Sequence, residues 1–394
     1  MDKKNKNPNV PNLRFNQFNS EWERKSIGDL INEVKEYTSS FEKYPLYSFT
    51  IESGVTPKTE RYERNFLVKK DGDLFKVVHP NNFVMNPMNL RFGAINYSKQ
   101  TIDVSVSGYY DIFEIDNSNY NDFWNAYFKA PQTINIYNAI ATGSLIEKKR
   151  VHFSQLKSLK FYLPSNDEKK KINSFIKLLD ERISVQIKII NDYKMLKKSI
   201  VERIISTTDI SWNKHSFKDI FRERKELHVK DGTIIHATLS KEGIYPKTDR
   251  YDRDFLVKDE DKKYKVSYLN DICYNPANLK FGVITRNDYG KCLVSPIYVT
   301  YMVNPGFNPK FIELFVTRTA FLKEIRRYEQ GTVYERMAVS SDDFLTFETK
   351  LPNVEVQNDI VNNIDMLDKK ITQEQEYLEL LYKQKNYLLS NMFI

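Results

Sequence analysis

The chain of 394 residues carries one basic, aromatic stretch twice, and this duplication decides the fold. Residues 57–69 read PKTERYERNFLVK, and residues 246–258 read PKTDRYDRDFLVK. The same offset of 189 residues relates NPMNLRFGAI (86–95) to NPANLKFGVI (275–284). Unrelated segments do not agree in this way by chance, so an internal repeat is predicted.

The match extends along most of the chain with small changes of offset. The offset is 190 residues upstream and 188 downstream, and such one-residue drifts are what loop insertions produce. Each copy is far longer than the roughly 20 to 50 residues of a repeat array, so two large modules are predicted. Further matched positions are Trp22 with Trp212, Gly143 with Gly331, and Leu179-Asp180 with Leu367-Asp368.

Each copy begins with a mixed α+β domain. Short runs such as DVSVSGYYDIFEI (103–115) and CLVSPIYVTYMV (292–303) are rich in β-branched and aromatic residues and predict strands. The segments 121–140 and 311–328 have the spacing of amphipathic helices. Gly54 and Pro57 indicate a loop before the duplicated stretch.

Each copy ends in a long helix, because residues 168–205 and their counterparts contain neither proline nor glycine. Apolar residues recur there at heptad-like steps, which predicts an antiparallel coiled coil within the chain. The alternative is that each helix docks on its own domain. The packing positions are Ile172, Ile176, Leu179, Ile183, Ile190, Ile200, Ile360, Ile364, Leu367, Ile371, Leu378, Leu381 and Leu388.

The expected fold class is therefore α+β: two pseudo-symmetric mixed α/β domains separated by two long antiparallel helices. Pro164 and Pro352 precede the helices, a place where proline is tolerated. The predicted segments are a first domain at 1–164, a helical spacer at 165–207, a second domain at 208–352 and a second spacer at 353–394.

Composition bears on partners and compartment. The net charge of +8 and the pI near 9.0 suit a polyanionic partner such as DNA, although a chain rich in Lys, Asn, Ile and Tyr from an AT-rich genome also drifts basic. Two cysteines form no disulfide framework, and no apolar run reaches the roughly 20 residues of a membrane span. A cytoplasmic protein is expected.

Two loops in each copy combine cations with amide side chains. Arginine can contact guanine and asparagine can contact adenine bidentately, so these loops are candidates for duplex DNA binding. The alternative is that Glu60 and Glu63, kept as Asp249 and Asp252, pair with the arginines in a salt-bridged turn. The candidates are Lys58, Arg61, Tyr62, Arg64, Asn86, Asn89, Arg91, Lys247, Arg250, Tyr251, Arg253, Asn275, Asn278 and Lys280.

Signatures of catalysis are missing from the sequence. SGVTPKT (53–59) lacks the second glycine of a phosphate-binding loop, and no GxGxxG occurs. The five histidines do not have zinc-ligand spacing. NPMN and NPAN lack the second proline and the aromatic residue of an adenine methyltransferase motif. No catalytic residue and no metal site is therefore assigned.

Taken together, these segments resemble the specificity subunit of a type I restriction–modification system. The resemblance covers essentially the whole chain. It rests on PNLRFNQFNSEWERKSIGDL (11–30), on the two NPxNL segments, on YGKCLVSPIYV (289–299), and on Leu-Pro followed by a Leu-Asp-x-x-Ile helix in each copy. The chain departs from the family where a Glu-Gln pair usually starts each helix: it has Glu168-Lys169 and Val356-Gln357.

The resemblance implies a non-catalytic subunit with two target recognition domains, each reading half of a bipartite DNA site. It implies that the helices act as a spacer and dock two methyltransferase subunits and, through them, two restriction/translocase subunits. S-adenosylmethionine, ATP and Mg²⁺ would be bound by those partners. The alternatives are a coiled-coil adaptor without sequence-specific DNA binding and an independent enzyme.

Overall fold

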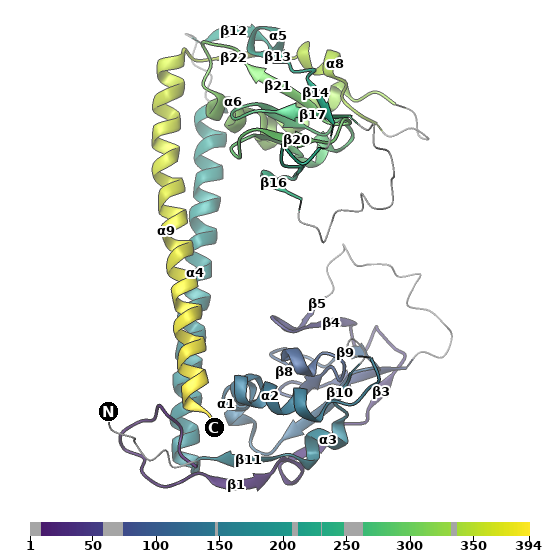
Figure 1. Cartoon of the computed structure of the whole chain (residues 1–394), viewed down its shortest axis with the longest axis vertical. Helices are drawn as coiled ribbons and strands as arrows, with labels where there is room; N and C mark the ends of the chain where they lie inside the picture. The colour runs from purple at the N-terminus through teal and green to yellow at the C-terminus, as the bar shows by residue number, and fades with distance from the viewer. Residues whose placement is uncertain are drawn as a thin grey trace. The chain divides into compact units, whose positions relative to one another are not determined.

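The computed structural model describes residues 9–57, 74–145, 149–206, 212–229, 231–247, 263–331 and 337–394. The chain forms two compact units, one of Met1–Ile187 with Glu376–Ile394 and one of Lys188–Gln375. Each unit contains one mixed α/β domain and part of both long helices (Figure 1). The predicted fold class is confirmed, whereas the four predicted segments are a different division of the chain and stay a prediction.

The domain of the first unit is built from short antiparallel sheets. Their strand orders are β2-β10-β7-β8, β3-β6-β9, β4-β5 and β1-β11. The central strand β7 is buried throughout, in keeping with its apolar sequence FVM. The strands are β1 (Glu23–Ser26), β2 (Ile31–Glu33), β3 (Tyr37–Thr38), β4 (Tyr47–Thr50), β5 (Gly54–Pro57), β6 (Phe75–Val78), β7 (Phe83–Met85), β8 (Ile95–Tyr97), β9 (Val104–Ser107), β10 (Asp111–Ile115) and β11 (Lys160–Leu163).

The domain of the second unit repeats this topology. Its sheets have the orders β13-β21-β18-β19, β14-β17-β20, β15-β16 and β12-β22, one for each sheet of the first unit. The strands are β12 (Asn213–Ser216), β13 (Phe221–Glu223), β14 (Leu227–Val229), β15 (Ala237–Leu239), β16 (Ile244–Pro246), β17 (Lys263–Ser267), β18 (Ile272–Tyr274), β19 (Ile284–Arg286), β20 (Cys292–Val294), β21 (Val299–Val303) and β22 (Glu348–Leu351).

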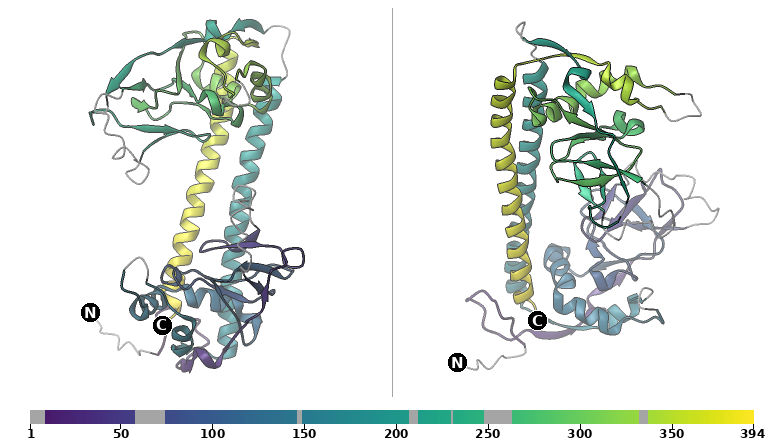
Figure 2. Two further views of the ribbon diagram at one scale, coloured as in Figure 1. Left: turned by 90° about the vertical axis from the view of Figure 1, so that its right-hand side faces the viewer. Right: turned by 45° about the horizontal axis from the view of Figure 1, so that its top comes forward.

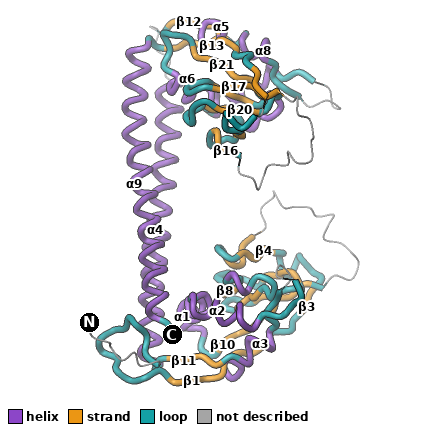
Figure 3. Tube along the Cα trace, viewed as in Figure 1, coloured by secondary structure: helices purple, strands orange, loops and turns teal. Residues whose placement is uncertain are grey.

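Short helices complete both domains (Figure 3). The first domain has η1 (Ile27–Asp29), η4 (Leu90–Phe92), η5 (Ser118–Tyr120), α1 (Asn121–Lys129), α2 (Pro131–Ile140) and α3 (Phe153–Ser158). The second domain has α5 (Phe217–Ile220), η8 (Pro276–Phe281), α6 (Pro309–Val316), α7 (Thr319–Glu324), η9 (Ile325–Tyr328) and α8 (Ser341–Leu345).

Three local expectations need correction. The segment 311–328 is not one helix: it is divided among α6, α7 and η9, and Arg318 between α6 and α7 is extended with ψ of 145°. The segment 121–140 is two helices, because Pro131 forces Ala130 into an extended conformation with ψ of 143°. Gly54 and Pro57 are the first and last residues of β5 rather than parts of a loop. Among the strands that the structure describes, β5 pairs with β4 alone, so the missing N–H of Pro57 is tolerated there.

The two long helices are α4 (Asn166–Ser206) and α9 (Val354–Met392), and they run antiparallel (Figure 2). In the first unit, Asp180 of α4 binds Lys385 of α9, and Arg182 binds Tyr377. In the second unit, Lys197 donates to Asp368 at 2.5 Å. Residue numbers therefore increase along α4 where they decrease along α9, as expected for antiparallel helices.

The predicted packing positions are buried or half-buried, and several of them pack into the domain cores. Ile172 and Ile176 join the first domain's core with Trp124, and Ile364 joins the second domain's core with Phe344. Both packing schemes considered from the sequence are therefore combined. The buried heptad residues are Ile172, Ile176, Ile183, Ile190, Ile360, Ile364, Ile371 and Leu381; the half-buried ones are Leu179, Ile200, Leu367, Leu378 and Leu388.

The altered Glu-Gln pairs have a structural explanation. Glu168 is fully buried at the start of α4 and accepts two hydrogen bonds from Arg14, at 2.7 and 2.6 Å. Gln357 is fully buried at the start of α9 and bonds Pro352 and Asn308, each at 2.8 Å. Each copy therefore keeps one polar residue that ties the helix start to its own domain. Among the described residues, no helix is both long and apolar enough to cross a membrane.

Candidate DNA-recognition surfaces

The duplicated stretch, residues 57–69 and 246–258, lies almost entirely outside the described residues. Pro57 and Pro246 end β5 and β16, and Lys247 follows β16, where its backbone N–H donates to His236 at 2.9 Å. The remaining predicted residues of this stretch stay predictions. They are Lys58, Arg61, Tyr62, Arg64, Arg250, Tyr251 and Arg253.

The second pair of predicted segments forms two matching turns. In the first unit the turn connects β7 to β8 through η4, and in the second unit it connects β18 to β19 through η8. The side chain of Asn86 accepts from the N–H of Met88, and that of Asn275 accepts from the N–H of Ala277, both at 3.1 Å. Each asparagine therefore braces its turn through its Oδ1, and its contact with DNA stays a prediction.

Asn89, Arg91, Asn278 and Lys280 lie at the outer part of the same turns. Asn89 and Asn278 are exposed, and Arg91 and Lys280 are half-buried. The guanidinium of Arg91 lies 5.1 Å from the ring of Phe92, and the ammonium of Lys280 lies 5.4 Å from the ring of Phe281. Amide and cationic groups presented in this way can contact base edges and phosphates, so these four residues stay candidates.

Sequence reasoning missed the two phenylalanines at these turns. Phe92 is 61% exposed and Phe281 is 57% exposed, and they occupy the same place in the two copies. The signal available in the sequence was the identity of the aromatic residue in NPMNLRFG and NPANLKFG. Nothing in the sequence says that this ring points into solvent, because apolar residues in such runs are more often buried.

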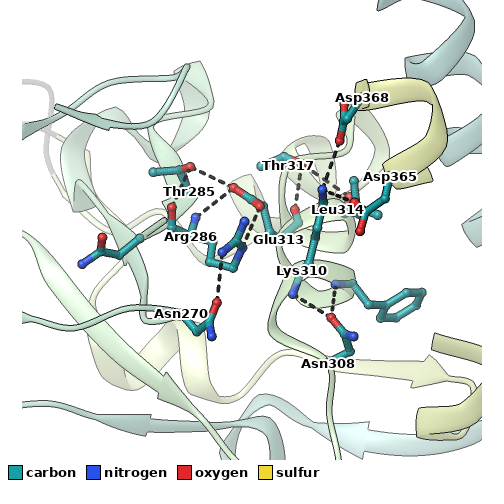
Figure 4. Close-up of polar contacts among 12 residues, drawn as sticks. Asn270, Thr285, Arg286, Asn308, Lys310, Glu313, Leu314, Thr317, Asp365 and Asp368 are labelled. Carbon is teal, nitrogen blue, oxygen red and sulfur yellow. Dashed lines mark hydrogen bonds and ion pairs between the residues drawn. The ribbon is translucent and has the colours of Figure 1, made fainter. Parts of the chain in front are cut away.

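In the second unit, an ion-pair network ties the domain to the helix pair (Figure 4). Lys310 of α6 binds Asp365 and lies 3.1 Å from Asp368, both on α9. Asp368 also accepts from Lys197 of α4 at 2.5 Å. Burial lowers the pKa of Lys310, but its bonds to the two aspartates outweigh this effect and raise it.

The network continues into the sheet of the second unit. Glu313 of α6 accepts from the Thr285 hydroxyl at 3.0 Å and from the backbone and the side chain of Arg286, both at 3.1 Å. Arg286 lies on β19, the strand that follows the turn bearing Phe281. The turn is therefore connected through β19 and α6 to the helix pair (Figure 4).

The first unit keeps the ion pair between the two helices, but it does not repeat the ion pair that Lys310 makes between domain and helix. Asp180 and Lys385 repeat the pair of Asp368 and Lys197. Asp122 stands where the second unit has Lys310, and it accepts from the Tyr97 hydroxyl at 2.6 Å. Because Asp122 and Asp180 carry the same charge, they cannot form the ion pair seen in the second unit.

Other contacts hold the first domain to its helices. The N–H of Phe123 donates to Asn173 of α4 at 2.9 Å, and Gln132 donates to the carbonyl of Ser390 on α9 at 2.7 Å. Lys129 at the end of α1 lies between domain and helices. Burial lowers its pKa to about 8, with a smaller contribution from the charges of nearby lysines.

In the first domain, His79 connects the ends of β3, β6 and β9. His79 contacts Asp103 through Nδ1 and Glu36 through Nε2, both at 2.9 Å. Partial burial lowers the pKa of His79, but the hydrogen bonds and charges of the two carboxylates outweigh it and raise the pKa. In the second domain, Tyr268 takes this place and its hydroxyl donates to Glu226 at 3.0 Å.

The polar clusters described so far are ion pairs and turns. Within the described ranges, no group of three or more His, Cys, Asp or Glu side chains is arranged to hold a metal ion. Cys273 and Cys292 are both buried, and burial raises the pKa of the Cys292 thiol to about 11. We assign no nucleophilic role to either thiol.

Three solved structures resemble the chain over nearly its whole length. A chain from a structure of complex assembly and conformational transition of the type I restriction–modification system has a TM-score of 0.56 at 10% identity, covering 94% of this chain and 97% of its own. The S subunit of the type I restriction–modification system from M. genitalium gives 0.48 at 13% identity, covering 98% and 99%. The HsdS subunit from Thermoanaerobacter tengcongensis gives 0.43 at 11% identity, covering 94% and 96%.

No protein-family model and no curated protein matches the chain. At these identities the likeness concerns the fold, and we compare folds through the first structure because its TM-score exceeds 0.5. The chain has the fold of a chain of a type I restriction–modification system.

Proposed function

We propose that this chain is the DNA sequence-specificity subunit of a type I restriction–modification complex. Each unit reads one half of a bipartite duplex site, and the helices space the halves. The helices also dock two methyltransferase subunits and, through them, two restriction/translocase subunits. The chain itself makes and breaks no bond. S-adenosylmethionine, ATP and Mg²⁺ belong to the partners, and the complex acts in the cytoplasm.

The observation that carries this proposal is the duplicated domain. Both units contain the same set of sheets in the same strand order, and each presents the same turn with a cation at its outer part. A site with two separate halves needs two readers held in one molecule. The net charge of +8 supports a polyanionic ligand, and the fold likeness supports this particular system.

DNA reading is tested by duplex binding of the full chain at several salt concentrations. We expect affinity that falls steeply with salt, because cations that neutralise phosphates release counterions. A pool of randomised duplexes enriched on the chain should converge on two short half-sites separated by a fixed gap of unspecified sequence. Absence of any salt-dependent duplex affinity would favour an adaptor without DNA binding.

Partner docking is supported by apolar side chains on the outer faces of both helices. Leu178 on α4 is 63% exposed, and Met366, the equivalent residue on α9, is 69% exposed. We expect L178D together with M366D to abolish capture of the methyltransferase subunit, while duplex binding by the isolated chain is unchanged. The matched control is K177A, which alters an exposed residue beside Leu178.

A catalytic function of the chain alone is the competing proposal. It requires that the purified chain methylates DNA with S-adenosylmethionine, or cleaves DNA with Mg²⁺. We expect neither activity until the partner subunits are added.

A further inference from the structure

Phe92 and Phe281 differ in exposure from the other phenylalanines of the two domains. Among the phenylalanines that the structure describes, only these two are exposed. By contrast, Leu90 and Leu279, which lie two residues before each ring, are fully buried. A single exposed apolar residue needs no explanation, but the same ring exposed at the same place in both copies does.

Each ring is carried on a rigid turn with the same internal hydrogen bonds. The N–H of Asn89 donates to Asn86 at 3.1 Å, and the N–H of Asn278 donates to Asn275 at 3.0 Å. After each ring, a glycine N–H closes the turn on the carbonyl of the buried leucine, at 2.8 Å for Gly93 and 2.7 Å for Gly282.

The glycines also fix the path of the backbone after each ring. Gly93 has φ of 84° and Gly282 has φ of 80°, a conformation that favours glycine. The chain therefore reverses immediately after the phenylalanine and enters β8 or β19. The braced turn therefore fixes the backbone that carries the ring and leaves the ring exposed.

The chemistry of the turn suits the face of a nucleobase beside a phosphate. Arg91 and Lys280 lie close to the ring that follows them, so each turn pairs an aromatic face with a cation. Aromatic rings stack on any base, and apolar side chains inserted between base steps unstack and kink a duplex. A protein partner would also cover the ring, but the adjacent cation in both copies favours an anionic ligand.

We propose that Phe92 and Phe281 enter the base stack of the DNA, one ring in each half-site, while Arg91 and Lys280 contact the neighbouring phosphates. This inference rests on the proposed DNA-reading function and adds to it a means of distorting each half-site. Specificity then includes the ease with which the contacted step unstacks, besides hydrogen bonds to base edges.

The test compares F92A and F281A in the full chain, using the duplex enriched from the randomised pool with the parent chain. We expect each substitution to lower affinity roughly 10-fold or more, in line with the loss of one stacked base. The dependence of log affinity on log salt should keep its slope, because no phosphate contact is lost. F92Y and F281Y should restore binding, since the aromatic face is retained.

Two comparisons separate stacking from charge and from nonspecific effects. R91A and K280A should each reduce the salt slope by about 0.9, as expected for one lost phosphate contact. Y387A and M195A remove exposed side chains of the long helices and should bind like the parent. With 2-aminopurine placed along the duplex, the parent should raise fluorescence at one step in each half-site, and F92A should remove one of the two signals.

The outcomes are distinguishable. If the parent chain binds the duplex and both alanine variants bind equally well, the inference is wrong and the proposed function stands. If those variants bind DNA normally but fail to capture the methyltransferase subunit, the rings belong to a protein interface. If the parent chain itself has no salt-dependent duplex affinity, the proposed function and this inference both fail.

Discussion

Individual residues in this chain are most informative where the two copies differ. Arg14 and Glu168 form a buried pair in the first unit, with side-chain exposures of 10% and 0%. The second unit uses the uncharged Gln357 to fasten its helix. The first unit therefore depends on a charge pair removed from water, and such a pair is sensitive to the loss of either partner.

We predict that R14M destabilises the first unit by about 3–5 kcal/mol, because the Glu168 carboxylate is then buried without a partner. The double variant R14M/E168Q should be less destabilised, because no net charge stays buried. Urea unfolding of the full chain measures both. Equal stability of the parent and R14M would contradict the assignment, and Q357E provides a comparison at the other helix.

His79 gives the first unit a dependence on pH at a position where the second unit has Tyr268. Because Glu36 and Asp103 raise its pKa above the usual value of 6.5, the folded state binds the proton more tightly than the unfolded state. The stabilisation is therefore full below pH 6.5 and is lost as the pH rises through the raised pKa.

Urea unfolding of the parent and H79F between pH 5 and 9 tests this sign. We expect the parent to lose stability relative to H79F as the pH rises through the raised pKa. The carboxylates of Glu36 and Asp103 contact the ring, and the Tyr44 hydroxyl donates to Glu36 at 3.0 Å. A constant difference between the two proteins across this range would refute the prediction.

At the scale of elements, the long helices were the most predictable part of the chain. The spacing of Ile172, Ile176 and Ile183 specifies a buried face without reference to any distant residue. The break at Pro131 was not predicted, although the residue before a proline tends to leave the helical region. The bond between Arg14 and Glu168 could not be predicted, because it joins residues 154 positions apart and depends on the completed fold.

The turns show the same limit for the candidate site. NPMN and NPAN were predicted to lie in loops, and they form turns braced by Asn86 and Asn275. The exposure of Phe92 and Phe281 was not predicted. A side chain's direction follows from the packing of Leu90 and Leu279 beneath it, which the sequence does not specify. Comparison of the two copies shows Asp122 where the second copy has Lys310. Its effect on the ion pairs could be seen only once the structure placed Asp180 and Asp368 nearby.

The helix pair provides a prediction at this scale. Deleting residues 183–189 of α4 together with residues 376–382 of α9 removes one heptad from each helix at facing positions. Seven residues span about 10 Å of helix, which corresponds to about three base pairs of duplex. We expect the enriched DNA site to keep its half-sites and to have a shorter gap. A gap of unchanged length would show that the helices do not set the spacing.

For the whole molecule, the duplication is both the clearest feature of the sequence and the basis of the proposed function. The two domains share their sheets and their turns, yet they fasten to the helices by different contacts: Lys310 with Asp365 and Asp368 in one, Gln132 with Ser390 in the other. A shared scaffold with different side-chain contacts in each copy is what we expect of two domains that each read their own half-site.

An exchange between chains tests this independence. Replacing residues 1–164 with the corresponding segment of a related chain should change one half-site of the enriched DNA and leave the other half-site and the gap as they were. Changes in both half-sites would mean that the two domains do not read DNA separately.

The central claim is that two kindred domains in one chain read two separated half-sites, and the sequence of the DNA modified by the assembled complex tests it most directly. The chain is combined with its methyltransferase subunits, and every methylated position in a random-sequence DNA library is determined. The account predicts two short specified elements separated by a gap of fixed length and free sequence. One continuous site, or methylation without sequence preference, would contradict it.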